Sequence, residues 1–166
     1  MMLDYIKTLA HYNVWANERI IDCIKVAGEE KANAIQKSSF DTILKTVFHI
    51  WDAEHIWLKR LEGSSPGSWP SKSFKGSFVE VFTGMSLTSK DFGKFADRLM
   101  EEDLKRTISY KNFKGDQFSS TFLEVVTHVF NHSTFHRGQL VTMLRAANSA
   151  DIKSTDLIAY YRELAQ

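Results

Sequence analysis

The position of the prolines constrains the fold of this 166-residue chain more than any other feature. Both prolines, Pro66 and Pro70, lie in one Gly/Ser/Pro-rich segment, residues 63–77. Because proline breaks helices, the chain on either side of this segment is free to form long ones. Apolar residues recur there at helical spacing, which predicts two pairs of helices joined by a long connection.

Four long helices are expected from this periodicity. They span about residues 3–26, 40–61, 87–102 and 120–147. Gly28 is a natural stop for the first helix, and Ser39 or Asp41 is the candidate cap of the second. The third can begin as early as Phe78, with an irregular start at Gly84.

A hairpin and a short helix complete the prediction. The stretch ISYKNFKGDQFSST, residues 108–121, indicates two short strands around a Lys-Gly-Asp turn. Residues 155–164 indicate a final helix, with Ser154 or Thr155 as its cap. We therefore predict an all-α fold, a four-helix bundle in one domain over residues 1–166. It has a long crossover loop, a small β-hairpin before the fourth helix and a short C-terminal helix.

Charge and composition argue against several classes of protein. With 21 basic and 20 acidic residues, the chain has a formal charge of +1 and no basic run, so we expect no nucleic-acid partner. Its first 20 residues lack the apolar stretch of a signal peptide, and no window is apolar enough for a membrane span. The single cysteine, Cys23, is typical of a reducing compartment, and we expect a cytoplasmic protein.

Two histidines of the predicted fourth helix, His132 and His136, are four residues apart. On a helical wheel they lie about 40° from each other. Their arc is otherwise apolar: Val125, Val129, Leu140 and Met143. Both imidazoles should therefore face the bundle core, where an i, i+4 pair can bring two nitrogens to one metal ion. Buried histidines that hydrogen-bond to neighbours would show the same spacing, and the pattern alone leaves both interpretations open.

A third metal ligand has to come from a facing helix. His49 lies near the middle of the predicted second helix. His128 lies about 40° from His132 on the other side, where it could either orient a ligand ring or face water. His11 and His55 are assigned to surface or packing positions.

Four stretches, in order along the chain, resemble the DinB family. HVFNHSTFHRGQL, residues 128–140, resembles the fourth-helix signature of that family, with its Asn-His-x-x-x-His-Arg-Gly-Gln core. FHIWDAEHIWLKRL, residues 48–61, resembles the second-helix motif, in which a histidine precedes an acidic, Trp-containing turn. HYNVWANERI (residues 11–20) and STDLIAYYREL (residues 154–164) resemble the first and closing helices, and are supportive only.

The resemblance implies a helical bundle with a three-histidine site for zinc, nickel or a similar divalent ion. By motif matching, the ligands are His49, His132 and His136, and all three are present. Imidazole ligands suit Zn, Ni, Cu and Fe alike, so the sequence does not choose the native metal. The family includes thiol-dependent transferases and a relative of maleylpyruvate isomerase, and its members are commonly dimers.

The expected function is that of a metal-dependent small-molecule enzyme, of the thiol-dependent transferase or hydrolase type. Its partners would be a low-molecular-weight thiol and a small electrophilic substrate, since Cys23 is assigned to packing. Asp52, Glu54 and His128 are candidate general bases, and none stands out. The alternative is a non-catalytic metal-binding module, for a stress response or for a small ligand.

Other polar residues allow two interpretations each. Asn13 and Asn17 face the predicted core, where they support the metal site or bond between helices. Gln139, near the histidine arc, binds a ligand or is a structural amide. Arg137 lies about 100° from His136, and we expect it to form a salt bridge or an interface contact.

A second apolar stripe lies opposite the histidines on the fourth helix. It consists of Leu123, Phe130 and Val141, flanked by Val126. A helix that is apolar on two sides is covered on two sides. The third helix and the tail could cover this stripe, or a second subunit could, and we expect a homodimer.

Overall fold

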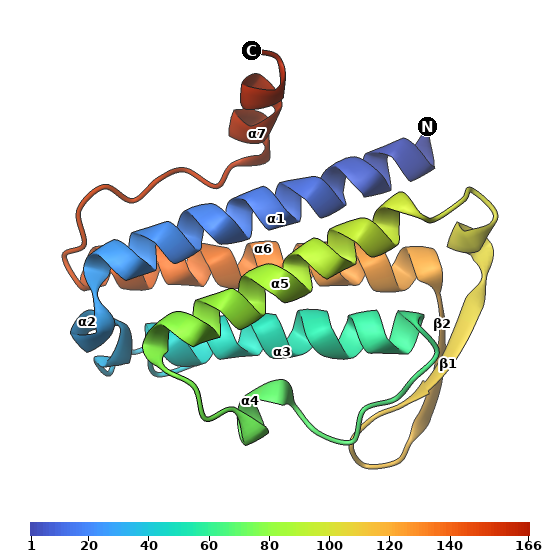
Figure 1. The fold of residues 1–166 in the computed structure, drawn as a ribbon, viewed down its shortest axis with the longest axis horizontal. Helices are drawn as coiled ribbons and strands as arrows, with labels where there is room; N and C mark the ends of the chain where they lie inside the picture. Colours follow the sequence, from blue (N-terminus) through green and yellow to red (C-terminus); the bar gives the residue numbers. More distant parts are fainter.

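Four long helices run side by side in the computed structural model, which describes residues 1–166 (Figure 1). They are α1 (Met2–Ala27), α3 (Ile43–Leu61), α5 (Phe78–Asp97) and α6 (Phe122–Ala146). An antiparallel hairpin of β1 (Thr107–Lys111) and β2 (Gln117–Thr121) lies at one end of the bundle, just before α6. A short helix, α7 (Leu157–Leu164), closes the chain. The predicted fold class is confirmed.

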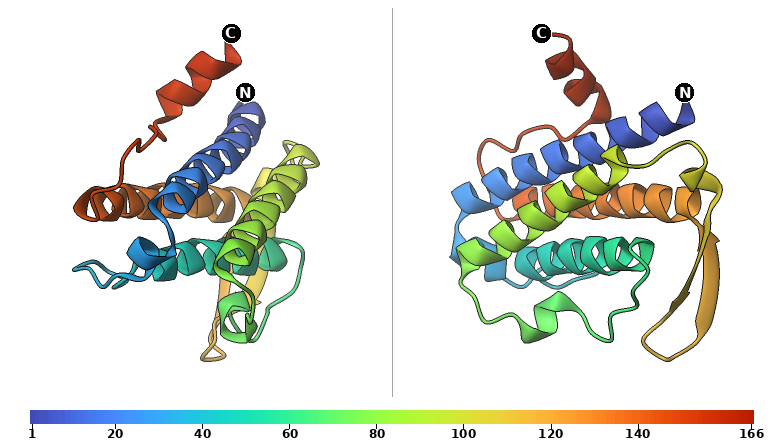
Figure 2. Two further views of the ribbon diagram at one scale, coloured as in Figure 1. Left: turned by 60° about the vertical axis from the view of Figure 1, so that its left-hand side comes forward. Right: turned by 45° about the vertical axis from the view of Figure 1, so that its right-hand side comes forward.

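The long connection between the helix pairs has a topological reason. α3 and α5 run in the same direction, so the chain between them must return along the length of the bundle (Figures 1 and 2). This return contains one helical turn, α4 (Pro70–Ser73), with proline at its first position, where no amide hydrogen is needed. The short helices α2 (Glu29–Asn33) and η1 (Asp103–Lys105) were not predicted.

The structure corrects one predicted helix start and decides between two starts that were considered for another. The second helix begins at Ile43, because Thr42, and neither Ser39 nor Asp41, accepts a hydrogen bond from the Lys45 amide. The third helix begins at Phe78, the earlier of the two predicted starts, and continues through Gly84. A capping box between Ser77 and Glu80 starts it, and the sequence pattern for that box was overlooked.

Gly84 is not a break in α5 but a site of close approach. A Cβ atom there would lie 2.5 Å from Cζ2 of Trp51 on α3. The indole itself is held by a hydrogen bond from Nε1 to Oγ1 of Thr88, at 3.0 Å. Glycine therefore allows α3 and α5 to pack against each other at this level.

The core consists of two apolar clusters of 14 buried residues each. The cluster nearer the hairpin includes Ile6, Leu61, Phe92 and Phe130, and the cluster at the other end includes Ile20, Ile43, Met85 and Leu140. Between them each long helix contributes buried polar side chains, which we call the polar layer: Asn13, Asn17, Glu54, Ser89, Ser133 and Arg137.

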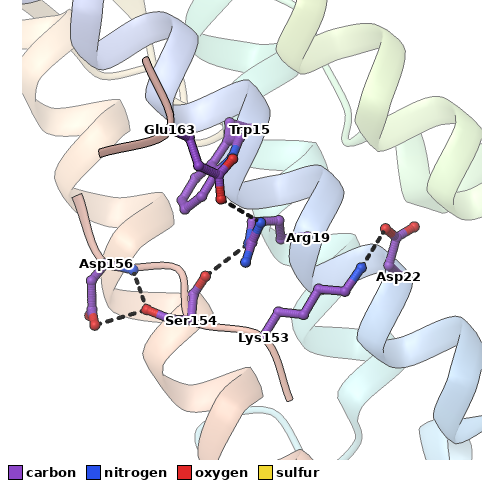
Figure 3. Close-up of polar contacts among 7 residues, drawn as sticks. All are labelled: Trp15, Arg19, Asp22, Lys153, Ser154, Asp156 and Glu163. Atoms are coloured by element: carbon purple, nitrogen blue, oxygen red, sulfur yellow. Dashed lines mark hydrogen bonds and ion pairs between the residues drawn. The ribbon is translucent and has the colours of Figure 1, made fainter. Parts of the chain in front are cut away.

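The C-terminal segment is attached to α1 by polar contacts (Figure 3). Glu163 accepts hydrogen bonds from Nε1 of Trp15 at 2.8 Å and from Arg19 at 2.9 Å. Arg19 also donates to the carbonyl of Ser154, and Lys153 pairs with Asp22. No helix is long and apolar enough to cross a lipid bilayer.

Candidate metal centre

Three half-buried or buried histidines come together where helices α3 and α6 face each other. One ring nitrogen of each of His49, His132 and His136 lies within 4.8 Å of the other two. The Nε2 atoms of His49 and His132 are 3.0 Å apart, and the ring centroids of the three pairs are separated by 4.4 to 4.8 Å. The i, i+4 spacing on α6 thus places two imidazoles against one from the facing helix.

Gln139 determines which nitrogen of His136 is free. Its Oε1 lies 2.8 Å from Nδ1 of His136, so Nδ1–H donates to the amide oxygen and Nε2 is left as an electron-pair donor. The amide nitrogen of Gln139 in turn donates to Oγ of Ser39, at 3.0 Å. These contacts show Gln139 as a structural amide, which is one of the two roles expected for it from the sequence.

His132 has a buried ring atom without a protein partner. Its Nδ1 is inaccessible and makes no hydrogen bond, and the hydrogen-bond partner of its Nε2 is Nε2 of His49. Two facing Nε2 atoms form one hydrogen bond at most, in which one of them carries the proton. The protein alone therefore leaves the polar atoms of this cluster poorly satisfied.

All three imidazoles are held in the neutral form that binds metal ions. Burial, reinforced by the neighbouring histidines, lowers the pKa of His132 to about 3. Burial, followed by the charge of His136, lowers the pKa of His49 to about 4. Burial also lowers the pKa of His136, although its bond to Gln139 opposes the shift. At neutral pH no proton has to leave these rings before a cation can bind.

The cluster fits a divalent ion. Metal–nitrogen bonds of about 2.0–2.1 Å place tetrahedral ligand atoms about 3.3 Å apart. The nitrogens here lie between 3.0 Å and 4.8 Å from one another, so a small contraction brings all three to one ion. Three protein ligands leave a further coordination position open, as in catalytic and not in closed structural zinc sites.

Aromatic side chains cover the cluster. The Phe40 ring lies 4.3 Å from that of His49 and 5.7 Å from that of His136. Phe135 on α6 lies 5.0 Å from His136 and is itself 62% exposed. Phe40 was not predicted as a site residue, because helical periodicity placed it at the start of a helix. Its position depends on the path of residues 34–42 over the bundle, which helical periodicity does not report.

The polar layer beneath the histidines is centred on Glu54 of α3, which is fully buried. Its carboxylate accepts hydrogen bonds from Asn13, Asn17, Ser89 and Ser133, at 2.5 to 2.9 Å. These donors come from α1, α5 and α6, so one carboxylate connects all four long helices. The bonding of the two asparagines is interhelical.

Arg137 is part of this layer, and its predicted role as a salt bridge or interface contact was wrong. The side chain is only 1% exposed and forms no ion pair within bonding distance. Its Nη1 donates to Oδ1 of Asn13 at 2.6 Å and of Asn17 at 2.8 Å, and its Nη2 donates to Thr134. Both asparagines donate to Glu54 in turn, so the two buried charges are connected through amides.

The layer and the histidine cluster alternate along α6. Ser133 follows His132, and Arg137 follows His136. The same turns of helix therefore present imidazoles to α3 on one side and the layer's donors to the core on the other. A shift of α6 along its axis would disturb both sets of contacts together.

The remaining sequence candidates lie outside the cluster. The exposed His128 packs its ring 5.3 Å from Trp57 and 5.7 Å from His132, without a hydrogen bond to a ligand ring. Asp52 accepts from the amide and the hydroxyl of Ser71. Cys23 is 3% exposed and receives a hydrogen bond from the Lys153 amide, in agreement with its assignment to packing.

The second apolar stripe of α6 is covered within the chain. Val126 and Phe130 are buried, and the Phe130 ring packs 5.5 Å from that of Phe92 on α5. Leu123 and Val141 are partly buried against the two apolar clusters. This stripe therefore needs no second subunit.

Comparison with known proteins agrees with this architecture. Two solved structures share the fold. One is a DinB-like protein from Bacillus cereus ATCC 10987, with a TM-score of 0.63 and 17% identity over 84% of this chain and 89% of that one. The other is a DinB-like protein from Bacillus subtilis, with a TM-score of 0.59 and 13% identity over 93% and 96%.

Sequence comparison defines the family. Protein DinB of Bacillus subtilis (strain 168) is 25% identical over 156 residues, which is 90% of each chain. The profile of the DinB family matches residues 2–158. The chain belongs to the DinB family.

Proposed function

We propose that the protein binds one divalent metal ion, zinc or nickel in the first place, through His49, His132 and His136. The observation that carries this proposal is the convergence of three neutral imidazoles with nitrogens within 4.8 Å of one another. The facing Nε2 atoms of His49 and His132 and the fixed tautomer of His136 support it. The same site would serve a metal-dependent reaction on a small molecule, of the thiol-dependent transferase or hydrolase type.

The chain's own residues would hold and shield the reacting centre. A bound divalent ion would supply Lewis acidity, which lowers the pKa of a thiol or water at the open position. Gln139 keeps Nδ1 of His136 protonated, and Phe40 limits the access of water from the side of residues 34–42. The thiol would come from a separate small molecule, because Cys23 is buried on α1 against the tail.

One observation favours a non-catalytic metal-binding module as the second candidate. The carboxylates nearest in sequence to His49 are both engaged, Asp52 with Ser71 and Glu54 with four donors of the polar layer. His128 forms no hydrogen bond to the cluster. A reaction that needs a general base would have to obtain it from the substrate or the thiol.

Metal analysis tests metal binding, which both candidate functions require. Protein purified without an affinity tag should contain close to one equivalent of metal per chain. The His136→Ala variant should lose it while it keeps the helical circular dichroism of the parent. The absence of stoichiometric metal from the parent, even after incubation with Zn²⁺ or Ni²⁺, would contradict the proposal.

A turnover assay distinguishes a metal-dependent enzyme from a non-catalytic metal-binding module. The metal-loaded protein is incubated with cysteine, glutathione or 2-mercaptoethanol and a panel of alkyl and aryl halides and epoxides. Thiol conjugation that requires metal and is lost in His132→Ala supports the transferase. Metal that remains bound but exchanges neither water nor thiol supports the module.

Two further expectations belong to the proposal. A homodimer is expected from the family resemblance, and multi-angle light scattering of the eluting protein measures it directly. A cytoplasmic location is expected from the single, reduced cysteine, and fractionation of the source cells tests it.

A further inference from the structure

A groove lies beside the histidine cluster, between residues 36–38 and the second half of α6. It encloses about 590 Å³, within the range of about 300–1,000 Å³ that is typical of small-molecule sites. One wall is apolar and consists of Phe135, Met143 and Ala146. Phe135 is 62% exposed and therefore offers an apolar surface next to the cluster.

The groove has one formal charge, and it is positive. Lys37 lies at its edge, no acidic residue lines it, and the Lys37 ammonium forms no ion pair or hydrogen bond within the chain. The ammonium group is a donor that is free to bind, so the groove favours an acceptor that carries negative charge.

The groove and the histidine cluster share two residues. Gln139 lines the groove and also binds Nδ1 of His136. Phe135 lines the groove and lies 5.0 Å from the His136 ring. A ligand in the groove therefore lies near the proposed metal position, with Gln139 and the His136 ring between them.

We propose that this groove binds the substrate of the metal site, and that the substrate is a small molecule with an apolar body and a carboxylate. The apolar body packs against Phe135 and Met143, and the carboxylate binds Lys37. The link to catalysis rests on the function proposed above, whereas the binding itself does not, because no lining residue is a metal ligand.

Gly138 offers a way to fill the groove without disturbing the core. It lines the groove, and a Cβ atom added there meets nothing within 4 Å. Leucine at this position places its side chain in the open space of the groove. Thr127→Leu is the matched control, since Thr127 is exposed on the same helix and lies outside the groove.

The binding test uses 3-phenylpropionate as the probe and its neutral amide as the comparison, with metal-free protein and amide chemical shifts as the readout. We expect the probe to shift the signals of Lys37, Gly138 and Gln139, and to bind several-fold more tightly than 3-phenylpropanamide. Gly138→Leu should abolish these shifts, and Thr127→Leu should leave them unchanged. Equal binding of acid and amide, or binding that survives Gly138→Leu, would overturn the proposal.

Charge removal provides the second measurement. Lys37→Ala should remove the preference for the acid over the amide, with a loss of about two- to five-fold in affinity, as for an exposed ion pair. Lys75→Ala is the control, because Lys75 is also exposed and unpaired but lies on the crossover segment. An equal loss in both variants would show a general effect of charge and would refute a role for Lys37.

Paramagnetic relaxation tests whether a ligand in the groove lies near the metal ion. In protein loaded with Co²⁺, the ring protons of bound 3-phenylpropionate should relax markedly faster than in protein loaded with Zn²⁺. Equal relaxation with both ions would show that the groove ligand lies too far from the metal to be its substrate. Because metal content is measured separately, failure of the metal site and failure of the groove give different results.

Discussion

The amide oxygen of Gln139 lies 2.8 Å from Nδ1 of His136. Both residues are on α6, three positions apart, so one turn of helix supplies a proposed metal ligand and the group that orients it. The amide nitrogen of Gln139 reaches Ser39, in the segment that carries Phe40 over the cluster. Gln139 thereby connects the imidazole to the segment that covers it.

Removal of this amide should weaken metal binding more than it weakens the fold. Groups that orient a metal-bound histidine typically account for about a 10- to 100-fold effect on metal affinity. We expect Gln139→Ala to lower Zn²⁺ affinity within this range, measured by competition with a chromophoric chelator. The urea midpoint of the metal-free protein should change little, since Gln139 lies at the edge of the site and not in the core.

Gln139→Glu is the conservative control for this prediction. Its carboxylate can still accept the proton of Nδ1, so the variant should keep most of the affinity that Gln139→Ala loses. If both variants lost the same affinity, the amide would act through Ser39 and not through His136.

The metal-free protein should lose stability as the pH falls below about 6.5, the pKa of unfolded histidine. Burial lowers the pKa of His49 to about 4 and that of His132 to about 3, so the folded protein resists their protonation while the unfolded chain accepts it. The unfolded state then binds more protons, and stability falls from pH 6.5 towards pH 4 and 3. Above pH 6.5 these two groups should contribute no pH dependence.

Urea denaturation at pH 7.5 and at pH 5.5 measures this effect, with the His49→Phe/His132→Phe variant as the control. The variant lacks both rings, so its urea midpoint should change less between the two pH values than that of the parent. An equal change in parent and variant would assign the pH dependence to other groups.

Helical geometry was sufficient for part of the site. His132 and His136 share one apolar arc of α6. In a helical bundle the apolar face of a helix packs against the neighbouring helices, so this arc was expected to face them. His49 could not be assigned in this way, because the register between two helices is a tertiary property; its assignment came from the family motif. Phe40 and Ser39 were missed because they belong to an irregular segment without a period.

Arg137 shows a second limit of prediction from sequence. Its position off the histidine arc suggested a salt bridge or an interface contact, yet α6 is buried on more than one side and the arginine lies inside. A signal was present in α1, where Asn13 and Asn17 are polar residues four apart on an apolar face. Buried amides need partners, but a single sequence does not say which helix supplies them.

Loss of the buried guanidinium should be strongly destabilising. Arg137→Met keeps the length of the side chain but leaves Glu54 without a compensating positive charge, and leaves Oδ1 of both asparagines without a donor. Breaking a buried charge pair typically costs about 3–5 kcal/mol of unfolding free energy. Urea denaturation of the metal-free protein measures the loss directly.

A double-mutant cycle with Glu54→Gln tests whether the two charges act as a unit although they do not touch. The combined loss should be smaller than the sum of the single losses, because each single variant leaves one buried charge uncompensated. Strict additivity would show that the asparagines isolate Glu54 from Arg137.

The two glycines Gly84 and Gly138 should respond in opposite ways to the same substitution. Alanine in place of helical glycine gains about 0.8–1 kcal/mol where space allows, and Gly138 has nothing within 4 Å of an added Cβ. At Gly84 the same methyl group would meet the Trp51 indole at 2.5 Å, and the bond from the indole to Thr88 opposes its displacement. Overpacking of this kind typically costs about 1–3 kcal/mol, which exceeds the helical gain.

We therefore expect Gly138→Ala to raise the urea midpoint and Gly84→Ala to lower it. A rise in both would mean that Trp51 moves aside at little cost, and that α3 and α5 do not depend on glycine for their close approach.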